Sequence, residues 1–470
     1  MNKKTSQSLR PNSPAQPSQT VITTNERTQQ LGQDLTKGSV VSHIARLSGF
    51  MMIGFVANNA AQLVEVAYLG LVGTAELAAI AFTFPATFAL HAIGRGLAAG
   101  GASLMARAHG AGDNEQVRRI ATHCLWLVVL FSIISVWAGS IWCRAFYSLL
   151  GADGLVLDLA VSYSQIFLIG FPTYVLGTVA GLLLRGIGNG TVPGLVMTFG
   201  SILQVILGPF LIFGWMGIPA MGIEGAAIAF VLSRFAAFFI AMHWILVREH
   251  LVTNSFTHLI QSWKAISHIG LPASINNLIP PVSAGIVTRL LAEHGDLVVA
   301  GFGVATRFEL IFWMMMAAVA SSVGPVVGQN WGAKHYTRVQ ETMRSSTIFC
   351  LFWGIFTFIA LGLFAEPMIT LINQDPIVID IATTYLVIVA LSLGFVGIQN
   401  AASFSFNALG KPGPALALSL LRLIVLYAPI AILANAFYGY MGVFYATAAV
   451  NVIAGIVSWI WNTKTITHHP

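Results

Sequence analysis

The sequence predicts an all-α integral membrane protein with about 12 transmembrane helices, arranged as two parallel-repeat six-helix lobes around a central cleft. Three observations support this fold class. Of the 470 residues, 56% are hydrophobic and only 9% are charged, whereas roughly one quarter of the residues of a soluble protein are charged. Apolar stretches long enough to cross a bilayer follow one another from Ile44 to Trp461. The second half of the chain also repeats the first.

The apolar sequence divides into about 12 spans at clusters of polar, Gly or Pro residues. Stretches such as 125–137 and 349–363 are apolar on every face, which excludes the alternating strands of a membrane β-barrel. Helices follow because lipid offers no hydrogen-bonding partner to an unpaired backbone group. The predicted helix cores are 44–68, 78–104, 121–142, 159–184, 193–213, 225–247, 269–291, 297–320, 346–364, 381–406, 415–436 and 442–462.

The segments outside the spans predict the tails and the link between the lobes. The N-terminal region is polar and has no apolar core, so we expect a disordered cytoplasmic tail there rather than a signal peptide. The expected domains are a tail over 1–40, an N-terminal six-helix lobe over 41–248, a cytoplasmic inter-lobe linker over 249–268, a C-terminal six-helix lobe over 269–463 and a cytoplasmic tail over 464–470.

The basic residues predict the orientation of the spans. With a cytoplasmic N-terminus, the loops expected outside hold Arg144 as their one basic residue, and the basic loops all lie inside. The positive-inside rule then places both termini in the cytoplasm, for a multi-pass protein of a bacterial inner (plasma) membrane. This asymmetry accounts for the formal net charge of +6, so we expect membrane lipid and no nucleic acid as a partner.

The two halves of the chain match each other at an offset of about 222 residues. Residues 109–117 match 331–339, residues 185–189 match 407–411, and Met221-Gly222 matches Met441-Gly442 after a two-residue slip. A repeat of six spans returns the chain to its starting side, so the halves are parallel, as in transporters whose ligand binds between two lobes. A membrane enzyme would need a convergent cluster of His, Asp, Glu or nucleophilic residues. We see none in the sequence and expect no enzyme, and the repeat disfavours a channel.

Short motifs along the chain carry a resemblance to one transporter family. They are GTAELAAI at 73–80, GAGD at 110–113, LRGIGN at 184–189, GIEGAA at 222–227, GLP at 270–272, GQN at 328–330 and NALG at 407–410. Over about 40–462 the chain resembles the multidrug and toxic compound extrusion (MATE) family, of the larger multidrug/oligosaccharidyl-lipid/polysaccharide exporter superfamily. The resemblance implies twelve helices in two lobes. It also implies a secondary active antiporter that exports drug-like or toxic organic solutes by alternating access.

Glu65 is the candidate coupling residue. Only Glu65 and Glu309 are acids well inside predicted spans, where a charge is costly and indicates function. Related proteins of one branch place an Asn and an Asp four residues apart in span 5, where this chain has Gln204 and Gly208. The oxygen ligands that a dehydrated Na⁺ needs are therefore incomplete. We expect no cofactor, and H⁺ in preference to Na⁺ as the coupling ion.

We assign four further residues to the coupling site, namely Arg95, His91, Gln204 and Asn58. Arg95 lies deep in span 2, one helical turn beyond His91, and the adjacency of spans 1 and 2 would bring it to Glu65. We therefore predict a Glu65–Arg95 ion pair that an arriving proton breaks. A neutral, hydrogen-bonded ring is the alternative to a proton-relay role for His91. No metal site is expected.

The substrate cleft is assigned to residues of three spans, namely Arg307, Glu309, Asn276, Asn277 and Phe84. Arg307 and Glu309 either line this cleft or neutralise one another within the lobe. The adjacent Pro280 and Pro281 predict a kink in span 7, which acts either as a hinge or as a static bend.

The expected substrate is an amphipathic organic cation or zwitterion, carried by a monomer. The excess of arginine inside the spans motivates an alternative, a flippase for an anionic lipid-linked saccharide. A Na⁺-coupled exporter of the same fold is the other alternative.

Overall fold

The computed structural model describes residues 31–468, and within them the chain is helical almost throughout, with short connections. The long helices are α1 (Val40–Val72), α2 (Thr74–Gly110), α3 (Asn114–Leu149), α4 (Gly154–Gly186), α5 (Thr191–Ile212), α6 (Gly222–His243), α7 (Leu259–Ala292), α8 (Asp296–Gly332), α9 (Tyr336–Thr370), α10 (Pro376–Ala408), α11 (Pro412–Leu420) and α12 (Ala428–Thr467). Three short 3-10 or π-helical segments are η1 (Trp215–Gly217), η2 (Trp244–Arg248) and η3 (Leu421–Tyr427).

Ten stretches of the described residues are long and apolar enough to cross a membrane, by length and composition. The last of them, Pro412–Thr467, has 56 residues and would be about 84 Å long as one helix, far more than the ~30 Å of hydrocarbon. It folds back at Gly439, whose φ of 59° and ψ of −148° are not helical. Polar and proline residues lower the hydropathy of α7, which is not among the ten. Counting α7, and counting Pro412–Thr467 twice, gives the twelve predicted spans.

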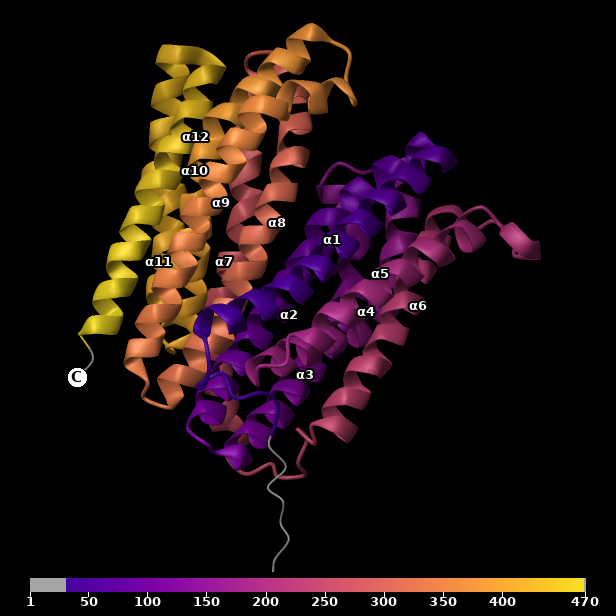
Figure 1. Cartoon of the computed structure of the whole chain (residues 1–470). Helices are drawn as coiled ribbons and strands as arrows, with labels where there is room; N and C mark the ends of the chain where they lie inside the picture. The colour runs from indigo at the N-terminus through magenta and orange to yellow at the C-terminus, as the bar shows by residue number, and fades with distance from the viewer. Residues whose placement is uncertain (1–30, 469–470) are drawn as a thin grey trace, which may run out of the picture. The chain divides into compact units, whose positions relative to one another are not determined.

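The helices form two bundles, α1–α6 and α7–α12, which Figure 1 shows side by side. The largest cluster of buried apolar side chains draws almost entirely on α1–α6, and the second largest draws on α7–α12. Each bundle therefore has its own apolar core, as expected for a lobe that moves as a unit. We call them the N-lobe and the C-lobe.

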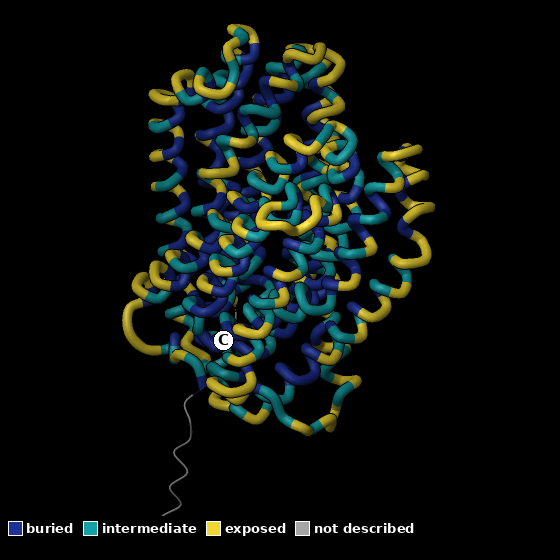
Figure 2. The backbone as a smooth tube through the Cα atoms, turned by 90° about the vertical axis from the view of Figure 1, so that its right-hand side faces the viewer, coloured by how far each residue is buried: buried dark blue, intermediate teal, exposed yellow. Residues whose placement is uncertain are grey.

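Large apolar side chains are exposed along the outer sides of the helices. Examples are Trp137 (61% exposed), Ile169 (76%) and Leu363 (68%). Figure 2 shows exposed residues recurring along the length of the outer helices, and not only at their ends. Such surfaces are unfavourable in water and favourable in lipid, so they agree with helices that span a bilayer.

The two lobes contact each other at the end of the molecule that carries the basic loops, which we call the basic end. Ser103 of α2 donates a hydrogen bond to the carbonyl of Asn407 at 2.5 Å, and Arg107 donates to the carbonyl of Leu409. The α2 and α8 backbones also approach closely, since a Cβ added at Gly110 would lie 1.9 Å from the carbonyl oxygen of Gln329. In Figure 1 the ribbons of the lobes meet at this end and diverge toward the other, the acidic end.

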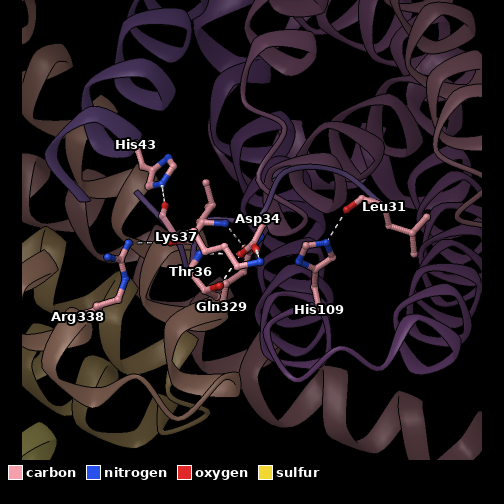
Figure 3. A network of polar contacts seen from close by, with 9 residues as sticks. Leu31, Asp34, Thr36, Lys37, His43, His109, Gln329 and Arg338 are labelled. Atoms are coloured by element: carbon pink, nitrogen blue, oxygen red, sulfur yellow. Dashed lines mark hydrogen bonds and ion pairs between the residues drawn. The ribbon is translucent and has the colours of Figure 1, made fainter. Parts of the chain in front are cut away.

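Residues 31–39, which we call the strap, lie at the basic end and bind the N-lobe. The Gln33 amide donates to the carbonyl of Ile187 at 2.8 Å, and the Gly32 amide donates to the Glu249 carboxylate at 2.9 Å. A ring nitrogen of His109 lies 2.5 Å from the carbonyl of Leu31 (Figure 3). These bonds satisfy backbone groups that would otherwise be unpaired in a buried segment.

The strap also binds the C-lobe. The Leu35 amide donates to the Gln329 side chain at 2.9 Å, and Arg338 donates to the carbonyls of Leu35 and Gly38. Gln329 in turn donates to the carbonyl of Gly186 in the N-lobe, and Leu35 is fully buried. Figure 3 shows Arg338 and His109 on opposite sides of the strap. Residues 31–39 therefore connect the lobes, and the prediction of a disordered tail over 1–40 is wrong for them. Residues 1–30 lie outside the described part of the chain.

Two other predicted boundaries differ from the helices. Helix α7 begins at Leu259, inside the predicted linker over 249–268, and α12 continues to Thr467, into the predicted tail over 464–470. Membrane helices commonly extend beyond the hydrocarbon, where the backbone still gains from helical hydrogen bonds. Hydropathy locates the apolar core of a helix and not its polar ends.

Candidate functional site

Glu65 lies inside the N-lobe, seven residues or about 10 Å before the end of α1. The buried Tyr163 of α4 donates its hydroxyl to one carboxylate oxygen of Glu65 at 3.3 Å. The Gln204 side chain of α5 donates to the other oxygen at 2.8 Å. Both partners are neutral. The carboxylate is therefore stabilised by hydrogen bonds from two other helices rather than by a direct ion pair.

Arg234 of α6 is the cation of this site. It is 8% exposed, and it donates to the oxygens of Gln204 and Asn58, each at 3.1 Å. Its guanidinium lies over the rings of Phe230 and Tyr174, 5.0 and 5.9 Å from their centroids. Gln204 thus accepts from Arg234 and donates to Glu65, so that a neutral amide separates the two charges. We call Glu65, Tyr163, Gln204, Arg234 and Asn58 the N-lobe cluster.

A small cavity lies beside Glu65, with room for about one water molecule. Tyr68, Gln204 and Gly208 line it together with apolar side chains of α1, α5 and α6. A Cβ at Gly208 would lie 2.8 Å from the Tyr68 ring. The absence of a side chain at Gly208 therefore leaves room for Tyr68.

The structure brings Glu65, Gln204 and Asn58 together as predicted, but it does not pair Glu65 with Arg95. In residues 31–468 the two ion pairs are Lys37–Asp34 and Arg144–Asp158. Arg95 is exposed and has no hydrogen-bonding partner there. The predicted Glu65–Arg95 pair is thus wrong, because adjacency of two helices does not determine which faces meet. The arginine that joins the cluster comes from α6.

His91 lies next to the N-lobe cluster without a hydrogen bond to it. Its ring packs against those of Tyr174 and Phe167, with centroid distances of 4.4 and 5.6 Å. Tyr174 is also one of the rings beneath Arg234. Nε2 of His91 is buried without a hydrogen-bonding partner. For this nitrogen the structure therefore shows neither a proton-relay contact nor the hydrogen bond expected of a neutral histidine ring.

The residues assigned to the substrate cleft lie on α2, α7 and α8 and differ in their exposure. Phe84 of α2 is 56% exposed and packs on Phe88, with ring centroids 5.6 Å apart. Asn276 and Asn277 of α7 are partly buried. Pro280 and Pro281 lie inside α7, which continues through both, so the predicted kink does not interrupt the helix.

Arg307 and Glu309 of α8 point in different directions and do not pair. Arg307 is exposed, whereas Glu309 accepts a hydrogen bond from the buried Tyr385 of α10 at 2.8 Å. Residues two apart on a helix face different sides, which explains the separation. Arg307 and Glu309 therefore do not neutralise one another, which was one of the two predicted alternatives.

Sequence reasoning missed Tyr163 and did not place Arg234. The internal repeat contained a usable signal, because Tyr163 and Tyr385 are separated by the same offset of about 222 residues that relates the halves. Both tyrosines donate to a glutamate of their own lobe. Repeat-related polar residues inside apolar spans therefore marked the partners of both acids.

Comparison with known proteins identifies the family. The MatE family model matches residues 51–210 and 272–433, which cover most of both lobes. The chain belongs to the MatE family. The predicted MATE membership is thus confirmed, and this MATE protein is a multi-pass membrane transporter of the exporter kind.

Three relatives give the range of similarity to this MATE protein. The FAD transporter of Shewanella oneidensis is 31% identical over 412 residues, covering 87% of this chain and 91% of the relative. The probable multidrug resistance protein YoeA of Bacillus subtilis is 23% identical over 435 residues, covering 89% and 93%. The crystal structure of the Vibrio cholerae MATE transporter VcmN in the bent form has a TM-score of 0.86 and 29% identity, covering 93% of this chain and 98% of that one. The predicted fold class is confirmed.

Proposed function

We propose that this MATE transporter exports its substrate in exchange for protons, and that Glu65 carries the proton. One observation supports this assignment above all. Glu65 lies within the membrane span of α1, with hydrogen bonds to neutral side chains and no direct ion pair. A carboxylate so placed gains from taking up a proton, since protonation removes a charge from a medium of low dielectric constant.

Protonation of Glu65 has a structural consequence in this proposal. The charged carboxylate accepts hydrogen bonds from α4 and α5, whereas a protonated one must donate from one oxygen. The Tyr163 hydroxyl can turn to accept this proton, whereas the Gln204 NH2 group can only donate and is left with a neutral, weaker acceptor while Gln204 still accepts from Arg234. The contacts among α1, α5 and α6 therefore differ between the two protonation states, and this difference couples the proton to the conformation of the lobe.

The proposal includes an orientation. Both termini lie in the cytoplasm of a cell with the protein in its inner membrane, which puts the basic end and the strap inside. Protons then reach Glu65 from the acidic end, which is also the nearer end of α1. Antiport in this direction uses the inward proton gradient to move a solute outward.

Two substrate classes are proposed. The first is an amphipathic organic cation or zwitterion, in line with the multidrug resistance names of several relatives. The second is an anionic flavin nucleotide, because the Shewanella relative is named a FAD transporter. Arg95, Arg289 and Arg307 favour the second class, since all three lie within spans, are exposed, and have no hydrogen bond or ion pair in residues 31–468. An arginine facing lipid is costly, so we place them toward water and an anion.

The coupling is tested in proteoliposomes with an imposed pH gradient or an imposed sodium gradient, using ethidium and FAD as probes. We expect the pH gradient alone to drive transport, and Glu65→Gln to abolish the driving effect while leaving binding of the probe measurable. The matched control is Glu224→Gln, an acid at the acidic end of α6. Transport that follows sodium alone, or that continues in Glu65→Gln, would contradict proton coupling at this residue.

The same assay separates the substrate classes. If the cleft binds an anion, Arg95→Ala lowers FAD transport and leaves ethidium transport unchanged. If the substrate is a cation, ethidium transport alone is observed, and it is unchanged or raised in Arg95→Ala.

A further inference from the structure

We propose a second proton-binding site in the C-lobe, formed by Glu309 of α8 and Tyr385 of α10. It extends the proposed function, in which Glu65 carries a proton in the N-lobe, by giving each lobe its own titrating carboxyl group. The ligand is a proton alone, which Glu309 binds at one carboxylate oxygen and releases unchanged.

The position of Glu309 supports a functional role. It lies thirteen residues or about 20 Å from the start of α8, well inside the span. The Tyr385 hydroxyl donates to its Oε2 atom at 2.8 Å, and Tyr385 is itself 4% exposed and packed against Phe302 and Phe444. An acid this deep in an apolar lobe is expensive to keep charged, and the tyrosine holds it in one orientation.

The charged and titratable groups that act on Glu309 are few. They are Tyr385 of α10, which donates a hydrogen bond, and Arg422 of η3, which interacts electrostatically. Tyr427 of η3 interacts electrostatically with Tyr385 and with Arg422. Arg422 donates to the oxygens of Gln399 at 3.2 Å and Asn451 at 2.5 Å, and it forms no ion pair with Glu309. The arginine is thus fixed by two neutral amides, near the acid but not bonded to it.

The C-lobe group has the same composition as the N-lobe cluster. In each lobe a glutamate accepts from a tyrosine, and an arginine donates to one Gln and one Asn oxygen. The tyrosines are related by the internal repeat, but the glutamates are not, because Glu65 is on the first helix of its lobe and Glu309 is on the second. The C-lobe site is therefore not a mere remnant of duplication: an acid from a different helix meets the equivalent tyrosine.

The alternative is that Glu309 is always charged and only balances Arg422. The two accounts differ in one measurable property, which is whether Glu309 changes protonation in the working pH range. Stability alone does not distinguish them, since either role would make the Glu309→Gln protein less stable.

The test is infrared difference spectroscopy of the full-length protein in lipid nanodiscs, between an acidic and an alkaline pH. Protonated carboxyl groups in apolar surroundings give separate carbonyl bands. We expect two such bands in the wild type, of which Glu309→Gln removes one and Glu65→Gln removes the other. An unchanged spectrum in Glu309→Gln would overturn the second site. An unchanged spectrum in Glu65→Gln would count against the proposed function instead, so the two failures are distinguishable.

Two further variants identify the band. Tyr385→Phe removes the hydrogen bond to Glu309 and is expected to shift the Glu309 band without deleting it. Tyr427→Phe is the matched control, because Tyr427 is a buried tyrosine of the same lobe that accepts from Thr447 and does not bond to Glu309. If Glu309→Gln does not fold, Glu309→Asp replaces it, and its band must move relative to the wild type. A band that Tyr385→Phe and Glu309→Asp both leave in place does not belong to Glu309 and would overturn the proposal.

Discussion

At the scale of the residue, neutral amides are what allow opposite charges to share the N-lobe interior. Gln204 and Asn58 bind the Arg234 guanidinium, and Gln204 alone also reaches Glu65. A direct ion pair would hold the carboxylate charged, whereas this indirect contact is compatible with the proton uptake that we propose for Glu65. Two oxygens and two aromatic faces stabilise the Arg234 guanidinium in this interior.

Substitutions of two arginines should therefore have unequal effects. Arg234→Ala leaves the buried oxygens of Asn58 and Gln204 without their donor, at a cost of about 1–3 kcal/mol for each unsatisfied group. Arg95→Ala removes an exposed side chain without a hydrogen bond, and we expect a change within about 0.5 kcal/mol. Thermal unfolding of both variants in the same detergent measures the difference. Equal midpoints would contradict the role given to Arg234.

At the scale of the element, α2 of the N-lobe and α7 of the C-lobe pack closely because glycine leaves room between them. A Cβ at Gly96 would lie 2.0 Å from the Ser274 hydroxyl and 2.6 Å from the carbonyl oxygen of Gly270. Ser274 also donates to the carbonyl of Ile93, which joins the helices by a polar contact. Small residues of this kind are how helices associate in lipid, where no hydrophobic effect drives them together.

Adding one methyl group at this contact should separate the two helices. For Gly96→Ala we expect a loss of about 1–3 kcal/mol, the usual cost of overpacking, together with slower transport. The matched control is Gly285→Ala in α7, where a Cβ would meet nothing within 4 Å and the stability should be unchanged or slightly higher. Unfolding midpoints and ethidium transport rates of the pair provide the measurement. A neutral Gly96→Ala would show that α2 and α7 are not held by this contact.

Individual helices show which parts of the fold and of the site could be predicted from the sequence. Apolar stretches between polar, Gly and Pro clusters located the helix cores well, and the predicted core 44–68, for example, lies wholly inside α1. The same reading missed the first residues of α7, because polar residues outside the hydrocarbon also adopt a helix. In the site, Glu65 was identifiable from the cost of an intramembrane charge, and Gln204 from the family resemblance. The arginine of the site could not be identified from the sequence. Choosing between Arg95 and Arg234 requires knowing which faces of α2 and α6 point toward Glu65.

At the scale of the whole molecule, the strap joins lobes that otherwise have separate cores. Its nine residues bind backbone and side-chain groups of α2, α8 and α9, and the carbonyl of Ile187, which follows α4. Two of its partners, Gln329 and Asn330, belong to a motif on which the family resemblance rests. Opening of the basic end would require these contacts to break, so the strap opposes that movement.

The strap should loosen in acid because of Asp34. Burial raises the pKa of this carboxyl, but hydrogen bonds from the Thr36 hydroxyl and amide, and the nearby Lys37, outweigh it and lower the pKa to about 2. Since an unfolded Asp titrates near 3.9, this contribution to stability is complete above about pH 4 and is lost as the pH falls toward 2. Hydrogen-exchange protection of the Thr36 amide should fall over this interval. In Asp34→Asn it should show no such step, and a step that persists there would assign the effect to another group.

The strap also constrains the order in which the protein is assembled. Leu35 is synthesised 294 residues before Gln329, the residue that binds its amide. During translation the N-lobe helices can insert and pack while the strap still lacks half of its partners. Its docking must await insertion of α8 and α9, so it is a late event in biogenesis. Protection of residues 31–39 from protease in nascent chains would therefore report that the second lobe has arrived.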